Sequence, residues 1–302
     1  MSIPSPDYFA RIKELIPAVI ETLSKKGIEE RHLQFGGEAK KEPKISIPTD
    51  ARSEFLANRA MGDWAEGALK DSFMSSNGIA VEISHYGDMD SIAAGEPGFK
   101  ENYLRAKEET RRWGKRPDLL VFPAGTVVPP DLTLLSREEA DDFARLAVVG
   151  IEVRSSKFKA DKYMAVKRQD KIDKKPSSRE TPSFTVKVED LKIVYRWIEV
   201  VQTQQMYAQV FFDSCFAINV FTIFEYVATA GKGFTIEKPE KSQNKATIMI
   251  PITNGERLGT FCVSPEFGVE VRETRTGRVD AYVRPKGGQL VLQEQAFKKL
   301  LL

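Results

Sequence analysis

Two short stretches, RPDLLVF at residues 116–122 and GIEVRSS at residues 150–156, each place an acidic residue inside an otherwise apolar run. Such runs predict β-strands, in which alternate residues point to the same face, so Glu152 shares a face with Arg154. A carboxylate on a half-buried strand face is unfavourable unless it is paired or bound to a metal ion. Asp118 and Glu152 therefore mark these strands as more than structural.

The two acids predict a divalent-metal site. On neighbouring strands Asp118 and Glu152 would repel each other and raise each other's pKa. Mg²⁺ removes this penalty, because it takes oxygen ligands and commonly uses one or two carboxylates together with water and a substrate phosphate. Glu66 is a third candidate, since it lies on the apolar stripe of an expected helix that Gly62 and Gly67 make thin enough to approach a sheet closely. A salt bridge from Glu66 to a core arginine is the alternative, and the two other acids favour the metal role.

The elements around these stretches predict an α/β fold, a mixed β-sheet flanked by helices. Helices are expected at residues 7–26, 51–74, 102–113, 136–146 and 189–202, and strands at 79–86, 118–122, 147–155, 184–188, 207–212 and 216–220. The last two strands are apolar enough to be covered on both faces. The expected domains are a helical N-terminal arm (1–49), the core (50–231) and a β-rich C-terminal appendage (232–302).

The composition excludes several other classes of hydrolase. The 302 residues include only two histidines, His32 and His85, too few for HExxH metalloproteases or histidine-rich binuclear sites. No GxSxG elbow accompanies them. The sequence shows no signal peptide and no apolar run of about 18 residues, so a cytoplasmic protein without a membrane span is expected. Cys215 and Cys262 are expected to be buried, reduced thiols.

Positive charge gathers after the second acidic stretch. The net charge is only +2, but residues 154–179 carry ten lysines and arginines against three aspartates. Such an excess can follow the phosphate backbone of a nucleic acid. A solvated surface loop explains the charge equally well, so charge alone does not decide.

The order of these features resembles a known group. An acid on a helix (MGDWAEGAL, 61–69), then RPDLLVF, then GIEVRSS, matches the core of PD-(D/E)xK nucleases. The EVRSS form with the downstream block SFTVKVEDLKIVYRWIEVVQ (183–202) and YAQVFFD (207–213) resembles type II restriction endonucleases, in particular the AccI-type branch. The resemblance covers residues 60–225. The bare motif is short and degenerate, but three acids in this order with the downstream block are fairly specific.

The resemblance implies a restriction-endonuclease-like fold and Mg²⁺-dependent hydrolysis of DNA. Asp118, Glu152 and the carbonyl of Val153 would hold the ion, which polarises the scissile phosphate and lowers the pKa of the water that attacks in line and expels the 3′ oxygen. Glu66 would hold a second ion or its water.

One departure concerns the last residue of the motif, where Arg154 replaces a lysine. Arginine can stabilise charge on phosphorus, but it stays protonated and cannot act as a base. Either Arg154 acts only through its charge, or Lys157 or Lys162 takes over the role of the lysine. A third possibility is an inactive site.

The basic segment follows the catalytic strand directly, which favours its role as a DNA-contacting arm. Ser155 and Ser156 either donate to a phosphate or simply end the strand. His85 is expected to be a polar strand-end residue. The further DNA-contacting candidates are Lys159, Lys167, Arg168 and Lys171.

Three functions remain open at this point. The first is a site-specific restriction endonuclease of the bacterial cytoplasm, a homodimer that reads a short palindrome in double-stranded DNA and has a cognate DNA methyltransferase as genetic partner. The second is a repair or junction nuclease that recognises DNA structure. The third is a non-catalytic DNA-binding protein on the same fold.

Overall fold

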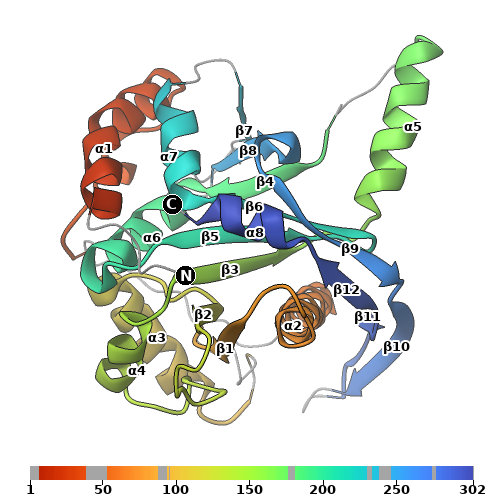
Figure 1. Cartoon of the computed structure of the whole chain (residues 1–302), viewed down its shortest axis with the longest axis horizontal. Helices are drawn as coiled ribbons and strands as arrows, with labels where there is room; N and C mark the ends of the chain where they lie inside the picture. The colour runs from red at the N-terminus through yellow and green to blue at the C-terminus, as the bar shows by residue number, and fades with distance from the viewer. Residues whose placement is uncertain are drawn as a thin grey trace.

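A seven-stranded mixed sheet runs through the centre of the molecule, in the order β1-β2-β3-β5-β6-β9-β12 (Figure 1). The computed structural model describes residues 7–38, 53–87, 94, 96–175, 181–229, 233–237, 246–273 and 277–301. The strands are β1 (Val81–His85), β2 (Leu119–Pro123), β3 (Val149–Ser155), β5 (Gln205–Val210), β6 (Ser214–Asn219), β9 (Glu256–Val263) and β12 (Gln289–Leu292). Only β3 and β5 pair in parallel within this sheet; the other neighbours are antiparallel. The expected mixed α/β architecture is confirmed.

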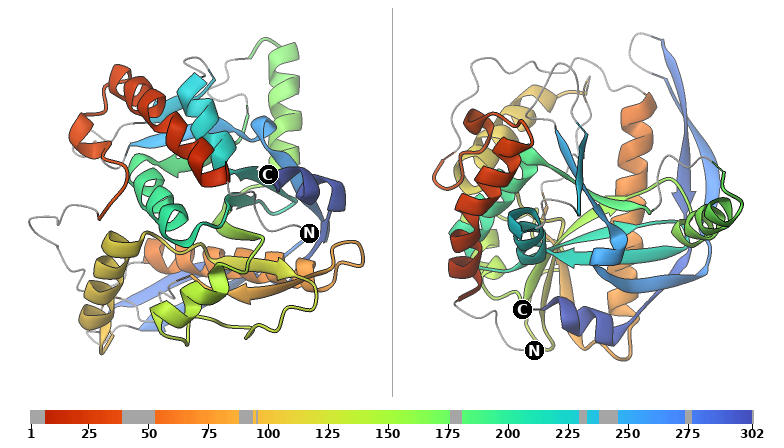
Figure 2. Two further views of the ribbon diagram at one scale, coloured as in Figure 1. Left: turned by 60° about the vertical axis from the view of Figure 1, so that its left-hand side comes forward. Right: turned by 90° about the horizontal axis from the view of Figure 1, so that it is seen from above.

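Helices cover both faces of the sheet (Figure 2). On one face, apolar side chains of α1, α4, α6 and α7 join Leu120, Phe122 and Tyr207 in one core. On the other face, apolar side chains of α2 and α8 join Ile151 and Val153 in a second core. Every residue of β5 and β6 is buried, as expected for strands covered on both faces. The helices are α1 (Asp7–Lys25), α2 (Ser53–Met74), α3 (Phe99–Trp113), α4 (Arg137–Ala144), α5 (Ala160–Ile172), α6 (Val188–Val201), α7 (Val220–Thr229) and α8 (Glu294–Leu300), and short 3₁₀ turns lie at Glu30–His32 and Ile252–Asn254.

The C-terminal region is rich in strands, as expected. It adds β9 and β12 to the central sheet, and its β7 (Thr235–Glu237) and β8 (Thr247–Pro251) form a smaller sheet with β4 (Ser183–Lys187). A two-stranded ribbon, β10 (Glu266–Glu273) with β11 (Val279–Lys286), runs beside α2. The expected domain boundaries stay predictions.

One face of this ribbon carries valines that point into solvent. Val269 pairs with Val283 across the ribbon, and Val271 pairs with Ala281. Val269 and Val271 are 71% and 68% exposed. The opposite face packs inward, where Tyr282 contacts the small cluster around Leu56.

Three helices, α5, α7 and α8, were not expected from the sequence. The basic segment was expected to be a loop or arm, and much of it forms α5, which projects from the end of the sheet (Figure 1). The apolar run after β6 forms α7, because the side chain of Asn219 accepts a hydrogen bond of 2.9 Å from the amide of Phe221 and so starts a helix there. The prediction of two buried thiols was half wrong, since Cys215 is buried but Cys262 is exposed. None of the described helices is both long and apolar enough to cross a membrane.

Candidate active site

Asp118 and Glu152 come together where β2 begins beside β3. The antiparallel register places Leu119 opposite Ile151, so the preceding residue, Asp118, continues the ladder beside Glu152 and on the same side. The amide of Val153 donates to Oδ2 of Asp118 at 2.6 Å, which fixes that carboxylate against β3. The two strand acids are therefore neighbours, as the sequence predicted. A role of the Val153 carbonyl as a metal ligand stays a prediction.

The buried carboxylate of Glu152 is neutralised on one oxygen only. Glu152 is 1% exposed. Its Oε1 accepts a hydrogen bond from the Lys115 amine and lies 3.1 Å from Nη2 of Arg154. Arg154 also donates to Oδ2 of Asp190 at 2.8 Å. Within the described chain Oε2 of Glu152 is buried and has no hydrogen-bond partner.

The pKa values of the two acids shift in opposite directions. Burial first, and then the charge of Glu152, raises the pKa of Asp118 to about 7. Burial alone would also raise the pKa of Glu152, but the positive charges of Lys115 and Arg154 outweigh it and hold that pKa below its usual value. Near neutral pH the site thus combines a firmly ionised carboxylate with one close to its titration midpoint.

Glu66 reaches the same region from the other layer. It lies on α2, which covers the opposite face of the sheet, and it is half-buried. Burial, followed by repulsion from Asp118 and Asp63, raises its pKa to about 8. A Cβ on Gly62 would lie 3.9 Å from a carboxylate oxygen of Glu66, an ordinary van der Waals contact, and a Cβ on Gly67 would have nothing within 4 Å, so neither glycine is required for the close approach of α2 that the sequence suggested. Glu66 thus belongs to the electrostatic environment of the strand acids.

The strand acids fit a divalent cation. A cation bound between the two carboxylates would give the buried oxygen of Glu152 a partner and would stabilise the ionised form of Asp118, whose pKa is raised. Across the parts of the chain that the structure describes, no three histidine, cysteine, aspartate or glutamate side chains gather closely enough to hold a metal ion by themselves. An ion here would rest on Asp118 and Glu152, with water or substrate oxygens completing its coordination. A direct role for Glu66 stays a prediction.

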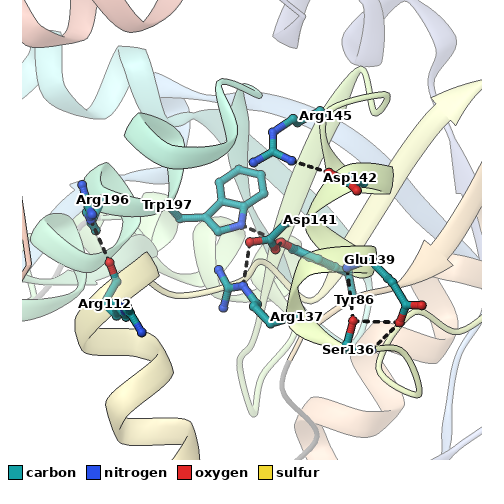
Figure 3. A network of polar contacts seen from close by, with 10 residues as sticks. All are labelled: Tyr86, Arg112, Ser136, Arg137, Glu139, Asp141, Asp142, Arg145, Arg196 and Trp197. Carbon is teal, nitrogen blue, oxygen red and sulfur yellow. Dashed lines mark hydrogen bonds and ion pairs between the residues drawn. The ribbon is translucent and has the colours of Figure 1, made fainter.

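A buried polar network supports the start of β2 (Figure 3). The hydroxyl of Tyr86 donates to Oδ1 of Asp141, and it accepts a hydrogen bond of 3.0 Å from Nε1 of Trp197. Nε of Arg137 donates to Oδ2 of Asp141 at 2.8 Å. The backbone amide of Tyr86 donates in turn to the carbonyl of Asp118 at 2.9 Å. The network therefore holds the backbone that carries a site acid.

The two serines at the end of β3 differ in their contacts. Ser155 is the last residue of β3. Oγ of Ser156 accepts a hydrogen bond of 2.7 Å from Gln209, and the amide of Ser156 donates to the carbonyl of Val210 at 2.9 Å. Ser156 thus ties the end of β3 to β5. His85 ends β1, as expected, and burial lowers its pKa.

The lysine candidates lie further along the chain, on the surface. Lys157 and Lys159 are exposed between β3 and α5, and α5 carries Lys162, Lys167, Arg168 and Lys171. The charges acting most strongly on Glu152 are instead those of Lys115 and Arg154. A catalytic role of Lys157 or Lys162 stays a prediction.

The first residues of α5 are hydrogen-bonded to the core, although the rest of the helix projects from it. The carboxylate of Asp213, in the turn between β5 and β6, accepts hydrogen bonds from the amides of Ala160 and Asp161 at 2.8 and 3.0 Å. Asp161 also forms an ion pair with Arg257 of β9. The basic helix is thus held in a defined place relative to β3.

Sequence reasoning missed Lys115. It stands three residues before Asp118, in the run WGKRPD at residues 113–118. A basic pair separated from the acid by one proline was the available signal, and its second member, Arg116, is buried with its guanidinium 5.1 Å from the ring centre of Tyr86. The contact of Lys115 with Glu152 depends on the pairing of β2 with β3, which no local pattern reveals.

A family model described as AccI restriction endonuclease matches residues 8–175 and 165–302 of this chain. These two matches together span nearly the whole sequence. Neither the curated proteins nor the solved structures yielded a match.

Proposed function

The chain belongs to the AccI restriction endonuclease family, and from that premise we propose that it is a type II enzyme that cuts double-stranded DNA within a short palindrome in a Mg²⁺-dependent reaction. The family implies a DNA-binding hydrolase. The observation that carries the finer proposal is the pair Asp118 and Glu152 on adjacent strands, with one carboxylate oxygen buried and unpartnered among the described residues.

Asp118 and Glu152 are the residues that would hold Mg²⁺. When bound, the ion supplies polarisation of the scissile phosphate and activation of water for attack. The chain's own contribution is to hold these carboxylates in place before substrate arrives. The amide of Val153 orients Asp118, and Arg154 orients Glu152 while being held by Asp190. Because Arg154 stays protonated, it adds fixed positive charge beside the phosphate and removes no proton.

The basic face of α5 is the proposed DNA arm. Lys167, Arg168 and Lys171 lie on it, and α5 begins five residues after β3 ends. Replacing its basic residues with alanine should weaken DNA binding at all sequences and reduce the slope of log affinity against log salt by about 0.9 for each phosphate that is no longer neutralised. Lys298→Ala on α8, where the amine pairs with Glu294, is the matched control and should leave the slope unchanged. An unaltered slope in the α5 variant would contradict the arm.

A palindromic target further implies two copies of the chain related by a two-fold axis. Analytical ultracentrifugation with and without duplex DNA measures this directly. A single copy on cleaved DNA would contradict the homodimer.

The central test is digestion of phage-length duplex DNA with Mg²⁺. We expect discrete fragments, and we expect Asp118→Ala and Glu152→Ala to lower the rate at least about 100-fold while DNA binding persists. Asp142→Ala is the control, because Asp142 is an exposed acid paired with Arg145 on α4. Cutting of branched DNA alone would favour a structure-specific nuclease, and salt-sensitive binding with no cutting would favour a non-catalytic protein. Normal turnover in either strand-acid variant would refute the site.

A further inference from the structure

Two cations meet Oε1 of Glu152, and they are held differently. The planar guanidinium of Arg154 lies between Glu152 at 3.1 Å and Asp190 at 2.8 Å, so it is fixed by two carboxylates. The amine of Lys115 donates to the same oxygen from a side chain that is 31% exposed. A lysine amine is a compact charge on a flexible stem, so it can move away while the backbone stays in place.

The backbone of Lys115 is firmly anchored. The preceding residue, Gly114, has φ +83°, and a Cβ there would lie 2.2 Å from the backbone nitrogen of Trp197. The amide of Lys115 donates to the carbonyl of Ile193 on α6 at 3.0 Å. This anchor aims the side chain at the sheet and leaves movement to the stem alone.

The placement of the amine puts it in competition with a divalent cation. Glu152 offers two oxygens, of which one already receives both cations and the other has no partner among the described residues. An ion bound by Asp118 and Glu152 would bring a charge of +2 next to the Lys115 ammonium, and like charges at that range repel. The nearest new anion is then a phosphate of the bound substrate.

We propose that Lys115 is an exchangeable counter-ion of this site: it neutralises Glu152 in the metal-free protein, yields its place to the divalent cation, and then pairs with the substrate phosphate. The idea rests on the proposed function for its last step and on the described contacts for its first. The Lys115 amine, three residues before Asp118 in the sequence, is then the mobile positive charge of the site, and the Arg154 guanidinium is the fixed one.

The competition can be measured without DNA. Isothermal titration of the metal-free chain with Mn²⁺ compares wild type with Lys115→Met and Lys115→Gln, two neutral side chains of similar length. Both variants should bind Mn²⁺ on the order of tenfold more tightly, because the competing charge is gone. Lys70→Met is the matched control, since the Lys70 amine on α2 donates to the carbonyl of Pro130, and it should bind as wild type does. Circular dichroism verifies that each variant is folded.

The same variants should cleave duplex DNA about 100-fold more slowly with Mg²⁺, since the phosphate loses its mobile partner. Tighter binding of Mn²⁺ combined with slower cleavage separates this role from a merely structural one, which would weaken both. Mn²⁺ binding that is unchanged, weaker or undetectable in both Lys115 variants would overturn the exchange. If wild type itself cuts no DNA, the proposed function fails, while the Mn²⁺ titration still decides the exchange.

Discussion

Replacing Asp118 with asparagine should stabilise the metal-free protein while it removes activity. Asparagine has nearly the same shape and still accepts the hydrogen bond from the amide of Val153. It carries no charge, so the repulsion between Asp118 and Glu152 disappears. The variant therefore trades function for stability at one position.

The magnitude follows from the pKa of Asp118. A rise from the ordinary 3.8 to about 7 on folding corresponds to about 4 kcal/mol at about 1.4 kcal/mol for each pKa unit. Water reaches part of this side chain, and screening by solvent roughly halves the effect, so we expect about 2 kcal/mol at pH 8. The sign is fixed by linkage: a carboxyl with a raised pKa in the folded state contributes its full stability below 3.8, and loses it as pH rises through the folded value.

Urea unfolding in EDTA, at pH 8 and pH 5, measures the difference between Asp118→Asn and wild type. The gain should be larger at pH 8 than at pH 5, where more of the folded wild type has taken up the proton. Asp142→Asn is the control, because the Asp142 side chain is 78% exposed, and it should change stability by less than about 0.5 kcal/mol. A destabilised Asp118→Asn, or a gain independent of pH, would refute the electrostatic account of the site.

Three further outcomes follow from the contacts around the site. Tyr86→Phe leaves buried Asp141 without the hydroxyl and should lower the free energy of unfolding by about 1–3 kcal/mol; a loss under about 0.5 kcal/mol in urea unfolding would contradict the network. Gly150→Ala should destabilise the protein by about 1–3 kcal/mol and slow cleavage, because the new Cβ would lie 2.5 Å from Cγ of Pro117. Gly67→Ala is the control, since a Cβ there has nothing within 4 Å, and it should be neutral or stabilising in thermal unfolding. Mn²⁺ affinity should rise from pH 6 to pH 8, since an ion displaces protons from carboxyls whose pKa values are raised to about 7 and about 8; calorimetry that shows no dependence on pH would contradict this.

The strand acids were predictable because their signal is local. A charged residue within an apolar strand is visible in the sequence itself, and the register of β2 with β3 then brings Asp118 beside Glu152. Lys115 was not predictable in this way. Its contact with Glu152 requires the strand pairing and also the packing of Gly114 against α6, which are long-range features.

Two of the three missed helices, α5 and α7, were missed for opposite reasons. In α5 the only buried residue is Ala160, so no apolar stripe of helical period exists to be recognised. In α7 the sequence is apolar almost throughout, and a short apolar run does not distinguish a helix from a buried strand. Side-chain acceptors at the starts of the two helices settle both cases: the distant Asp213 accepts from the first amide of α5, and Asn219 accepts from the amide of Phe221 two residues on.

The valine face of the β10–β11 ribbon bears on the solubility of the chain. A cross-strand pair of valines with a further exposed valine beside it, on a two-stranded ribbon, is the kind of surface on which strands of other molecules stack into intermolecular sheets. The same strands carry Glu270, paired with Arg284, and Arg272, paired with Glu96. Because Glu270 lies opposite Tyr282 on the inward-packing face, these charges do not shield the valines, and we expect concentrated solutions of the protein to self-associate through the ribbon.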